Sequence, residues 1–348
     1  MTSEVNSPLK GAVRRPFLVL RAVRRSFLVL LLALFAVSCA SESEFVAQGA
    51  AQGSTFVVRA YGDSLNVAES DIARWLSDYN RAVSAWDPQS ELSRLNRGEV
   101  LVPTLVLRDL LQVAEGIRQA TDSLVEPALE PVLQAWGFTA GTQMLPSAAG
   151  AERDSALVDS LMQLVRWAPP VEGAEGLSLR HPINVNAFAQ GHSVDLVLDS
   201  LRTRGATAAF VEIGGEIRTF GRKPNGQPFT VGIEKPLTSG DRSLQLTVEL
   251  EDRALATSGN YRKFQSDPKT GQRFGHSMNP RTGWPAPTDV LSATLIGPSC
   301  AEADAYATLA MVQGLEATKA WLAQHPEWDA ILIFSAADGA LGIYNSMK

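Results

Sequence analysis

The chain has 348 residues, 45% of them apolar and 20% charged, which suffices for one large domain or two modest ones without disulfide or metal staples. Its net charge is −6, but the residues before Cys39 carry six basic side chains and one acidic one, which leaves −11 on the rest. Nucleic-acid binding needs clustered Lys and Arg, so this acidic body excludes nucleic acid as the expected partner.

The N-terminal segment has the pattern of an export signal. Three arginines within residues 21–25 precede the apolar run 27–37, which is shorter than the roughly 20 residues of a membrane span. The run ends in Ala-Val-Ser before Cys39, which resembles a bacterial lipobox, in which the cysteine is lipidated and becomes the mature N-terminus. An ordinary signal peptide or a short anchor is the alternative.

These features predict three parts of the chain: a lipoprotein signal peptide (1–38), the lipidated Cys39 with a short tether (39–49), and an extracytoplasmic, membrane-anchored domain (50–348). With Cys39 lipidated, Cys300 would be the remaining thiol. It could form no internal disulfide, and the sequence has no Cys/His spacing typical of zinc, so we expect Cys300 in the core.

Hydrophobic periodicity predicts mostly helices in the first part of the domain. A strand is expected at 55–60, and a short strand at 183–185. Helices are expected at 67–83, 107–121, 156–167 and 187–201.

From residue 208 onward short apolar runs alternate with Gly, Pro and Asn, which predicts an antiparallel meander. Its strands are expected at 210–213, 217–220, 229–233, 244–250 and 254–257. A strand at 291–296, helices at 301–312 and 315–324, and a strand at 330–334 follow. Helices and strands are partly segregated and no linker interrupts 45–348, so we expect one α+β domain rather than a doubly wound parallel sheet.

Two stretches have small residues at predicted turns. The first, Asn184–Asp195, leads from a strand into a helix, whose N-terminus favours anionic groups. The second, Glu212–Ile217, holds a glycine pair between two strands. Each allows a ligand to approach the backbone, but a tight packing turn or a plain hairpin would use the same residues.

Two further motifs offer oxygen ligands and hydrogen-bond donors. Thr, Ser, Gly and Asn within 256–262, followed by 275–283 with His276, resemble a phosphate cradle, although a lone histidine is more often structural. Asp304 and Thr308 are four residues apart on a predicted helix, so their oxygens share one face and suit Mg²⁺. The competing interpretation is an acid at a helix N-terminus beside a threonine bonded to its own backbone.

In their order these motifs resemble the ApbE family, the FAD:protein FMN transferases, over residues 52–334. Gln52-Gly-Ser-Thr is similar to the family's opening Met-Gly-Thr-Thr type motif, and the segment 83–96 to its Ser-Leu-Asn segment. Glu126-Pro and Trp136-Gly-Phe are similar to its Asp-Pro-Thr and Trp-Gly-Phe elements. The resemblance implies an α+β fold: a single ApbE-like, T-fold-related domain with an antiparallel sheet and flanking helices.

The resemblance also implies a site. Asp304, Thr308 and the backbone carbonyl of Ala187 would bind Mg²⁺, with Asp304 and His276 as catalytic residues. FAD, as substrate, would contact Gln52, Trp86, Glu126, Asn184, Gln190, Thr257 and Met278. The implied reaction is Mg²⁺-dependent cleavage of FAD, transfer of FMN to a threonine of an acceptor subunit in a membrane redox complex, and release of AMP. The lipid anchor would place this reaction at the periplasmic face of a bacterial membrane.

Six positions depart from the family pattern: Asn186 and Ala187 replace glycines, and the other four replace charged residues. Asn184 replaces an acid, Gln190 a lysine, Asn279 an aspartate and Glu126 another aspartate. The lost lysine removes a charge that would pair with phosphate. Two alternatives therefore remain: FAD hydrolysis to FMN and AMP with water as nucleophile, and a non-catalytic lipoprotein that binds FAD.

Overall fold

The computed structural model describes residues 43–139, 142, 155–234, 244–259, 264–266, 273–336, 338 and 340–347, and every structural statement below concerns these residues. The predicted signal peptide and the lipidation site Cys39 lie outside them, as do residues 260–262 of the predicted cradle. None of the described helices is long and apolar enough to cross a membrane.

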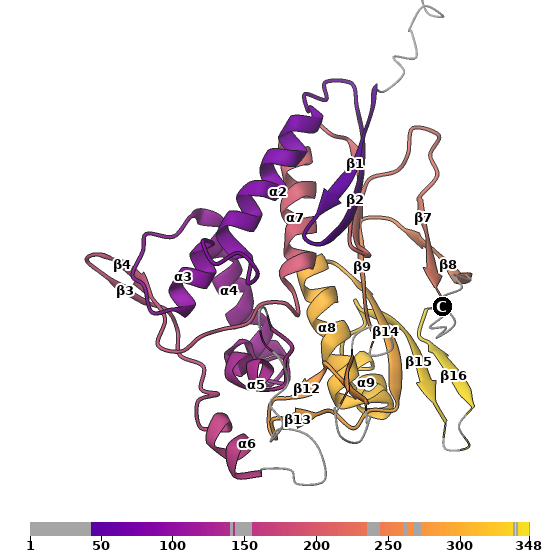
Figure 1. The fold of residues 1–348 in the computed structure, drawn as a ribbon. Coiled ribbons are helices and arrows are strands. Elements are labelled where there is room, and N and C mark those ends of the chain that lie inside the picture. Colours follow the sequence, from indigo (N-terminus) through magenta and orange to yellow (C-terminus); the bar gives the residue numbers. More distant parts are fainter. Residues whose placement is uncertain are drawn as a thin grey trace, which may run out of the picture. The chain divides into compact units, whose positions relative to one another are not determined.

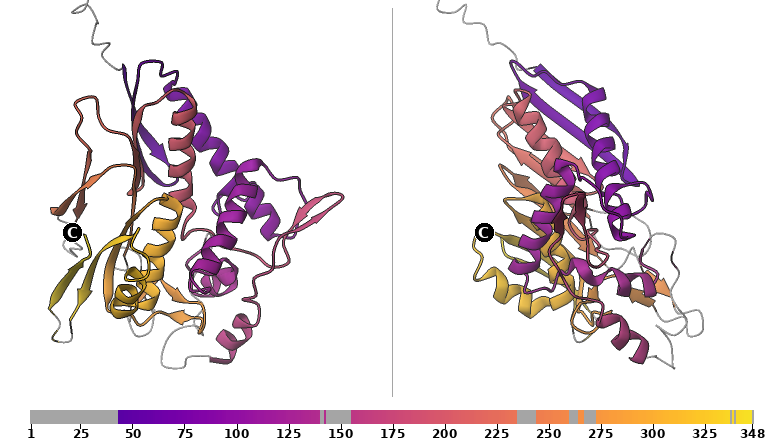
Figure 2. Two further views of the ribbon diagram at one scale, coloured as in Figure 1. Left: turned by 180° about the vertical axis from the view of Figure 1, so that it is seen from behind. Right: turned by 90° about the vertical axis from the view of Figure 1, so that its left-hand side faces the viewer.

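An antiparallel sheet forms the centre of the described domain (Figures 1 and 2). Its eight described strands lie in the order β1-β2-β5-β6-β9-β14-β15-β16, and each neighbouring pair is antiparallel. Their bounds are β1 Ser43–Ala51, β2 Ser54–Gly62, β5 Ala208–Ile213, β6 Glu216–Phe220, β9 Ala254–Gly259, β14 Val290–Gly297, β15 Asp329–Ser335 and β16 Leu341–Asn345.

Helices cover one face of this sheet, with α7 (Ala189–Thr203) and α8 (Cys300–Gln313) against it and α2 (Glu69–Val83) beside α7 (Figure 1). Helix α8 is rich in alanine and buried on nearly all sides, as expected of a helix without a polar face. The other described helices are α3 Glu91–Asn96, α4 Leu105–Ala120, the 3₁₀ turn η1 Pro127–Leu129, α5 Glu130–Ala135, α6 Ser155–Met162 and α9 Leu315–Leu322.

The opposite face of the sheet carries the hairpin of β7 (Phe229–Glu234) and β8 (Leu244–Leu250), which Figure 2 shows apart from the main sheet. Val231, Val248 and Leu250 of the hairpin pack on Ile217 and Leu255 of the sheet, so both faces are buried. Smaller hairpins are β3 Val171–Gly173 with β4 Gly176–Ser178, β10 Phe264–Ser266 with β11 Arg273–Gly275, and β12 Met278–Asn279 with β13 Trp284–Pro285.

Asp195 couples the two central helices. From α7 its carboxylate accepts hydrogen bonds from the backbone N–H groups of Cys300 and Ala301 at 3.0 Å and from Ser299 Oγ at 3.1 Å. Arg218 on β6 donates to it at 2.8 Å. These bonds satisfy the free N–H groups at the start of α8 and fix the register of α8 against α7.

The fold class is confirmed as α+β with a large antiparallel sheet, but several elements differ from the sequence prediction. We predicted a tether at 39–49, whereas from Ser43 onward these residues form the first strand of the sheet. We predicted a strand at 183–185, but Ile183 instead exchanges both backbone hydrogen bonds with the side-chain amide of Asn96. The predicted meander is interrupted, because β7 and β8 leave the main sheet as a separate hairpin. Helix α6 ends at Met162 rather than at 167.

Other predictions agree closely with the structure. Cys300 is fully buried, as expected of a core residue.

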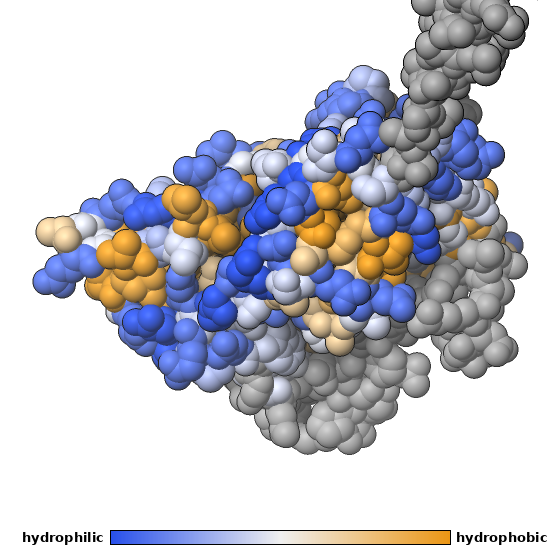
Figure 3. Space-filling model, turned by 90° about the horizontal axis from the view of Figure 1, so that it is seen from above, coloured by the Kyte–Doolittle hydropathy of each residue, from blue (hydrophilic) through white to orange (hydrophobic). Residues whose placement is uncertain are grey.

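Exposed apolar side chains occur next to the β3–β4 hairpin, namely Val100, Val102, Leu105 and Val171. In the space-filling view the apolar patches of the face shown are separated by polar residues (Figure 3).

Candidate active site

A cleft of about 1470 Å³ gathers segments that are spread along the chain from Gln52 to Thr308. Its walls come from the β1–β2 turn, the end of α2, the loop before η1, the turn before α7, the β5–β6 hairpin, β9, β12 and α8. Every site residue expected from the sequence, apart from Cys39, lines this cleft: Gln52, Trp86, Glu126, Asn184, Ala187, Gln190, Thr257, His276, Met278, Asp304 and Thr308. The structure therefore brings the candidate residues together.

Helix α8 presents Asp304 and Thr308 to the cleft, one helical turn apart. Asp304 is buried and accepts a hydrogen bond from the N–H of Gly191 at 3.2 Å, and Thr308 Oγ1 lies 3.4 Å from Ser258 Oγ. Gly191 is required here, because a Cβ would overlap the carbonyl of Cys300. The glycine therefore lets the start of α7 approach α8 and brings Asp304 beside the first turn of α7.

These oxygen ligands fit a hard cation that needs few protein ligands. Within the described residues no group of three or more His, Cys, Asp or Glu side chains could hold a metal ion. One carboxylate, one hydroxyl and nearby backbone carbonyls instead suit Mg²⁺, which keeps several waters and binds substrate phosphates. The donor set does not suit zinc, which prefers His and Cys ligands.

The turn before α7 is held by Asn184. Its Nδ2 donates to Glu130 Oε2 at 2.7 Å, and its Oδ1 accepts from the N–H of Asn186 at 2.9 Å. Burial raises the pKa of Glu130, and the hydrogen bond from Asn184 opposes that shift. An aspartate at position 184 would place a second carboxylate against Glu130, so the neutral amide at this departure from the family pattern is explained by its partner.

The β5–β6 hairpin closes another side of the cleft. Gly214 has a φ of +69°, and a Cβ there would overlap the side-chain amide of Gln190. Glu212 accepts a hydrogen bond from the N–H of Gly215 at 2.8 Å, and burial raises the pKa of its carboxyl group. The predicted glycine pair is therefore a hairpin turn and also a close approach to Gln190.

The described lining is rich in carboxylates and contains neither Lys nor Arg. Burial raises the pKa of Glu126, which also accepts a hydrogen bond from the N–H of Ala128 at 2.9 Å. The lining carboxylates are Asp87, Glu126, Glu212, Glu216 and Asp304. An anionic ligand in this part of the cleft therefore needs a cation from solution or backbone N–H groups to offset its charge.

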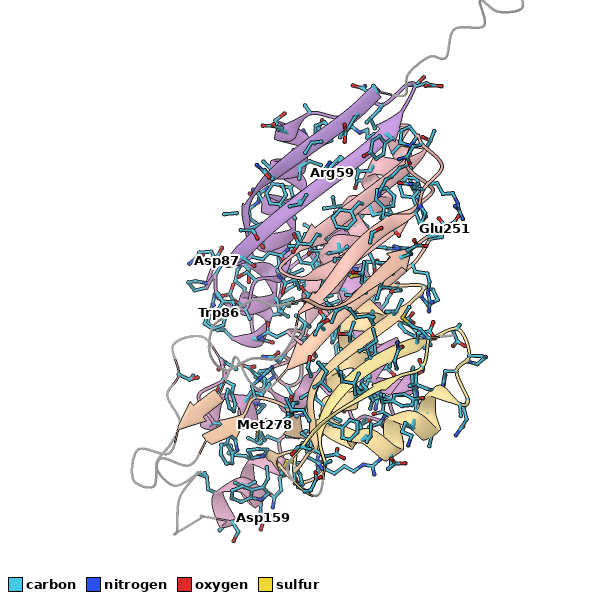
Figure 4. The ribbon with its side chains drawn as sticks, turned by 90° about the vertical axis from the view of Figure 1, so that its right-hand side faces the viewer. Arg59, Trp86, Asp87, Asp159, Glu251 and Met278 are labelled. Atoms are coloured by element: carbon cyan, nitrogen blue, oxygen red, sulfur yellow. The ribbon has the colours of Figure 1, made fainter. Side chains whose placement is uncertain are left out.

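Two apolar side chains, Trp86 and Met278, line the cleft. Trp86 follows α2 and is 67% exposed, whereas Met278 on β12 is buried against Trp136. Figure 4 shows Trp86 beside Asp87, with Met278 farther down on the β12–β13 hairpin. The indole N–H of Trp136 donates to the carbonyl of Gly283 at 3.1 Å and so anchors this hairpin. An exposed aromatic ring at a cleft is suited to stacking on a flat ligand.

Comparison with known proteins agrees with this arrangement. The ApbE family model matches residues 52–332, most of the chain. The chain belongs to the ApbE family. The FAD:protein FMN transferase of Vibrio cholerae is 32% identical over 329 residues, which cover 90% of this chain and 95% of the relative. That of Haemophilus influenzae is 30% identical over 297 residues, which cover 81% and 85%.

A solved structure, the flavin transferase ApbE from Vibrio cholerae, superposes with a TM-score of 0.72 at 27% identity and covers 88% of this chain and 97% of that chain. The ApbE fold expected from the motifs is thus confirmed over nearly the whole described domain. The role of each lining residue stays a prediction.

The sequence prediction missed some residues of the cleft. Tyr79 lines it although its spacing on α2 marks it as a core position, and only its hydroxyl distinguishes it from an apolar neighbour. Glu216 follows the glycine pair and faces the same space. The glycine pair was the available signal for Glu216, while nothing local to the sequence marked Tyr79.

Proposed function

We propose that this chain is an FAD:protein FMN transferase that cleaves FAD and moves FMN onto a threonine hydroxyl of an acceptor protein, with AMP as the leaving group. The observation that carries the proposal is the convergence of the family's motif positions on one cleft. At about 1470 Å³ the cleft exceeds the roughly 300–1,000 Å³ of ordinary ligand pockets, which leaves room for FAD and a segment of the acceptor.

We propose Mg²⁺ as the cation at Asp304 and Thr308, together with the backbone carbonyl of Ala187. The carboxylates in the described lining support this, because a cation bound among them would offset their charge and that of the pyrophosphate. When bound, Mg²⁺ offsets the charge that develops on the phosphate oxygens. Trp86 would stack on a ring of FAD, and Gln52, Glu126, Asn184, Gln190, Thr257 and Met278 would line its binding site.

In the proposed step, the threonine oxygen of the acceptor forms a bond to the FMN phosphorus while the bond from that phosphorus to the bridging oxygen breaks. The bridging oxygen leaves with AMP. His276 is the imidazole that lines the described part of the cleft, and we assign it the role of accepting the threonine proton. The hydroxyl of Thr308 and the carboxylate of Asp304 would hold the cation and take no part in the proton transfer.

We further propose that the enzyme acts at the periplasmic face of a bacterial membrane through a lipid on Cys39. The export signal and lipobox support this placement, and it would bring the cleft near acceptor subunits of membrane redox complexes. Only a few residues separate Cys39 from β1, which begins at Ser43. Radiolabelled palmitate incorporated by the wild-type chain and lost in Cys39→Ala would support the anchor. Equal labelling of both would contradict it.

The function is tested by incubating the full-length protein with FAD, Mg²⁺ and a purified candidate acceptor, then measuring AMP release and flavin fluorescence of the acceptor in a denaturing gel. The proposal predicts both signals, and their loss in Asp304→Ala and on chelation of Mg²⁺. Asp199→Asn, a change on the surface of α7 away from the cleft, is the matched control and should retain both. AMP release with an unlabelled acceptor would indicate FAD hydrolysis. Bound FAD without AMP release would indicate storage.

A further inference from the structure

Three side chains from different helices form a hydrogen-bonded chain that ends at the cleft. The Tyr79 hydroxyl donates to the carbonyl of Ala189 at 2.7 Å and lies 3.1 Å from Nδ1 of His192. Nε2 of His192 lies 2.9 Å from the Asp109 carboxylate. Tyr79 and His192 are buried, whereas the Asp109 side chain is 66% exposed. The chain therefore runs from the cleft wall to the surface.

The donors and acceptors along this hydrogen-bonded chain indicate which ring nitrogens of His192 carry protons. Burial raises the pKa of the Tyr79 phenol well above its ordinary value, so its hydroxyl keeps one proton, which points to the Ala189 carbonyl. His192 Nδ1 must then donate to the tyrosine oxygen. An ionised carboxylate only accepts, so Nε2 must also carry a proton. The three contacts are satisfied together by an imidazolium.

The ionisable side chains around His192 are mostly acidic. His192 and Asp109 border a second cavity of about 640 Å³, whose described lining does not include Tyr79. Arg218 on β6 is the basic side chain in the described lining of this cavity. On the side of the cleft, the negative charge of Asp304 adds to burial in raising the pKa of the Tyr79 phenol. The acids in the described lining come from three helices: Asp109 on α4, Asp195 and Asp199 on α7, and Glu302 on α8.

The carbonyl that Tyr79 fixes belongs to the first turn of α7. Ala187 and Gln190 of this segment line the cleft, and the N–H of Gly191 donates to Asp304. We propose that His192, held as an imidazolium by Asp109, is a positioning residue that acts through Tyr79 to fix the first turn of α7 for the reaction. This inference rests on the proposed function for its kinetic part only.

The first test measures directly whether both ring nitrogens of His192 are protonated. The full-length protein has four histidines, so its long-range ¹H–¹⁵N correlation spectrum contains signals from four imidazole rings. The signals of His192 are assigned as those that disappear in His192→Gln. At neutral pH, both ring nitrogens of His192 should carry protons, and the ring should lose one at lower pH in Asp109→Asn than in the wild type. A neutral His192 ring in the wild type would overturn the proposal.

The second test measures how the positioning of the first turn of α7 affects turnover. Tyr79→Phe should lower kcat for AMP release by about tenfold to a hundredfold, as loss of an outer-shell partner of a metal site typically does. Asp109→Asn should move the alkaline limb of the pH profile to lower pH with little change in KM. Asp199→Asn removes an exposed acid from the lining of the same cavity, but Asp199 is not a hydrogen-bond partner of His192, so its variant should shift the profile much less than Asp109→Asn. Identical profiles for the two asparagine variants would contradict the proposal.

A third measurement does not depend on turnover. Amide hydrogen exchange in the peptide that spans residues 187–193 should be faster in Tyr79→Phe and Asp109→Asn than in the wild type or Asp199→Asn. Unchanged exchange in both chain variants would refute the positioning role even if the protein releases no AMP. Absence of AMP release by the wild type would instead refute the proposed function, and the spectra and the exchange rates would still decide this inference.

Discussion

Replacing Asp195 by asparagine should destabilise the domain far more than the same change one turn along the helix. The carboxylate of Asp195 accepts from Arg218, Ser299 and two backbone N–H groups, and its side chain is only 14% exposed. An asparagine would turn its NH₂ group toward some of these donors and leave Arg218, which is 18% exposed, without its buried partner.

The cost can be estimated from these contacts. Hydrogen bonds to a charged group contribute about 1.5–3 kcal/mol each, and breaking a buried ion pair costs about 3–5 kcal/mol, so part exposure suggests about 3 kcal/mol in total. For a domain of about 300 residues, with an unfolding entropy of about 2.1 cal/mol/K per residue, that corresponds to a fall in Tm of about 5 °C. Asp199, 59% exposed and 3.7 Å from the same Arg218, contributes about 0.5 kcal/mol or less.

Thermal unfolding of the two variants, followed by circular dichroism at neutral pH, measures the difference. The structure predicts a large drop for Asp195→Asn and a negligible one for Asp199→Asn. Equal Tm values would refute the assignment of Asp195 as the cap that joins α7 to α8. A drop for both variants would show that the acidic charge, rather than the hydrogen bonds, is responsible.

Two further predictions concern the cleft. Gly214→Ala should lower the free energy of unfolding by about 1 kcal/mol, because φ at this position is positive. The added Cβ should also displace Gln190 and so weaken FAD binding, measured by quenching of flavin fluorescence. Unchanged FAD binding would contradict the close approach of Gly214 to Gln190. Because burial raises the pKa of Glu126 and Glu212, each ionises only as the pH rises past its raised pKa and then repels the pyrophosphate. FAD affinity without metal should therefore fall with rising pH, and less steeply in Glu126→Gln and Glu212→Gln. Glu302→Gln, a carboxyl with a raised pKa outside the cleft, should retain the wild-type slope; equal slopes in all three variants would refute this explanation.

Local spacing was sufficient to predict parts of the site. Asp304 and Thr308 share a helix face because their separation is one turn, whatever the rest of the chain does. The glycine pair at 214–215 was readable as a hairpin because the short segments on both sides of it are rich in β-branched and aromatic residues. The order of such local motifs also identified the family and thereby the fold.

Contacts between distant residues could not be predicted in this way. The segment 183–185 has the composition of a strand, but Asn96, 87 positions earlier, takes its backbone hydrogen bonds. Glu130, which explains the amide at Asn184, is 54 positions away, and Tyr79 meets His192 across 113. Such pairings depend on how helices and loops pack, which hydrophobic periodicity does not encode.

The central claim is that this cleft moves FMN from FAD to a protein threonine, and the mass of the acceptor tests it most directly. After incubation of the full-length enzyme with FAD, Mg²⁺ and the acceptor, intact-mass and peptide spectra should show the addition of FMN through a phosphoester on one threonine. The adduct should be absent with Asp304→Ala and with an acceptor in which that threonine is alanine. An acceptor of unchanged mass, with free FMN and AMP in solution, would contradict the account.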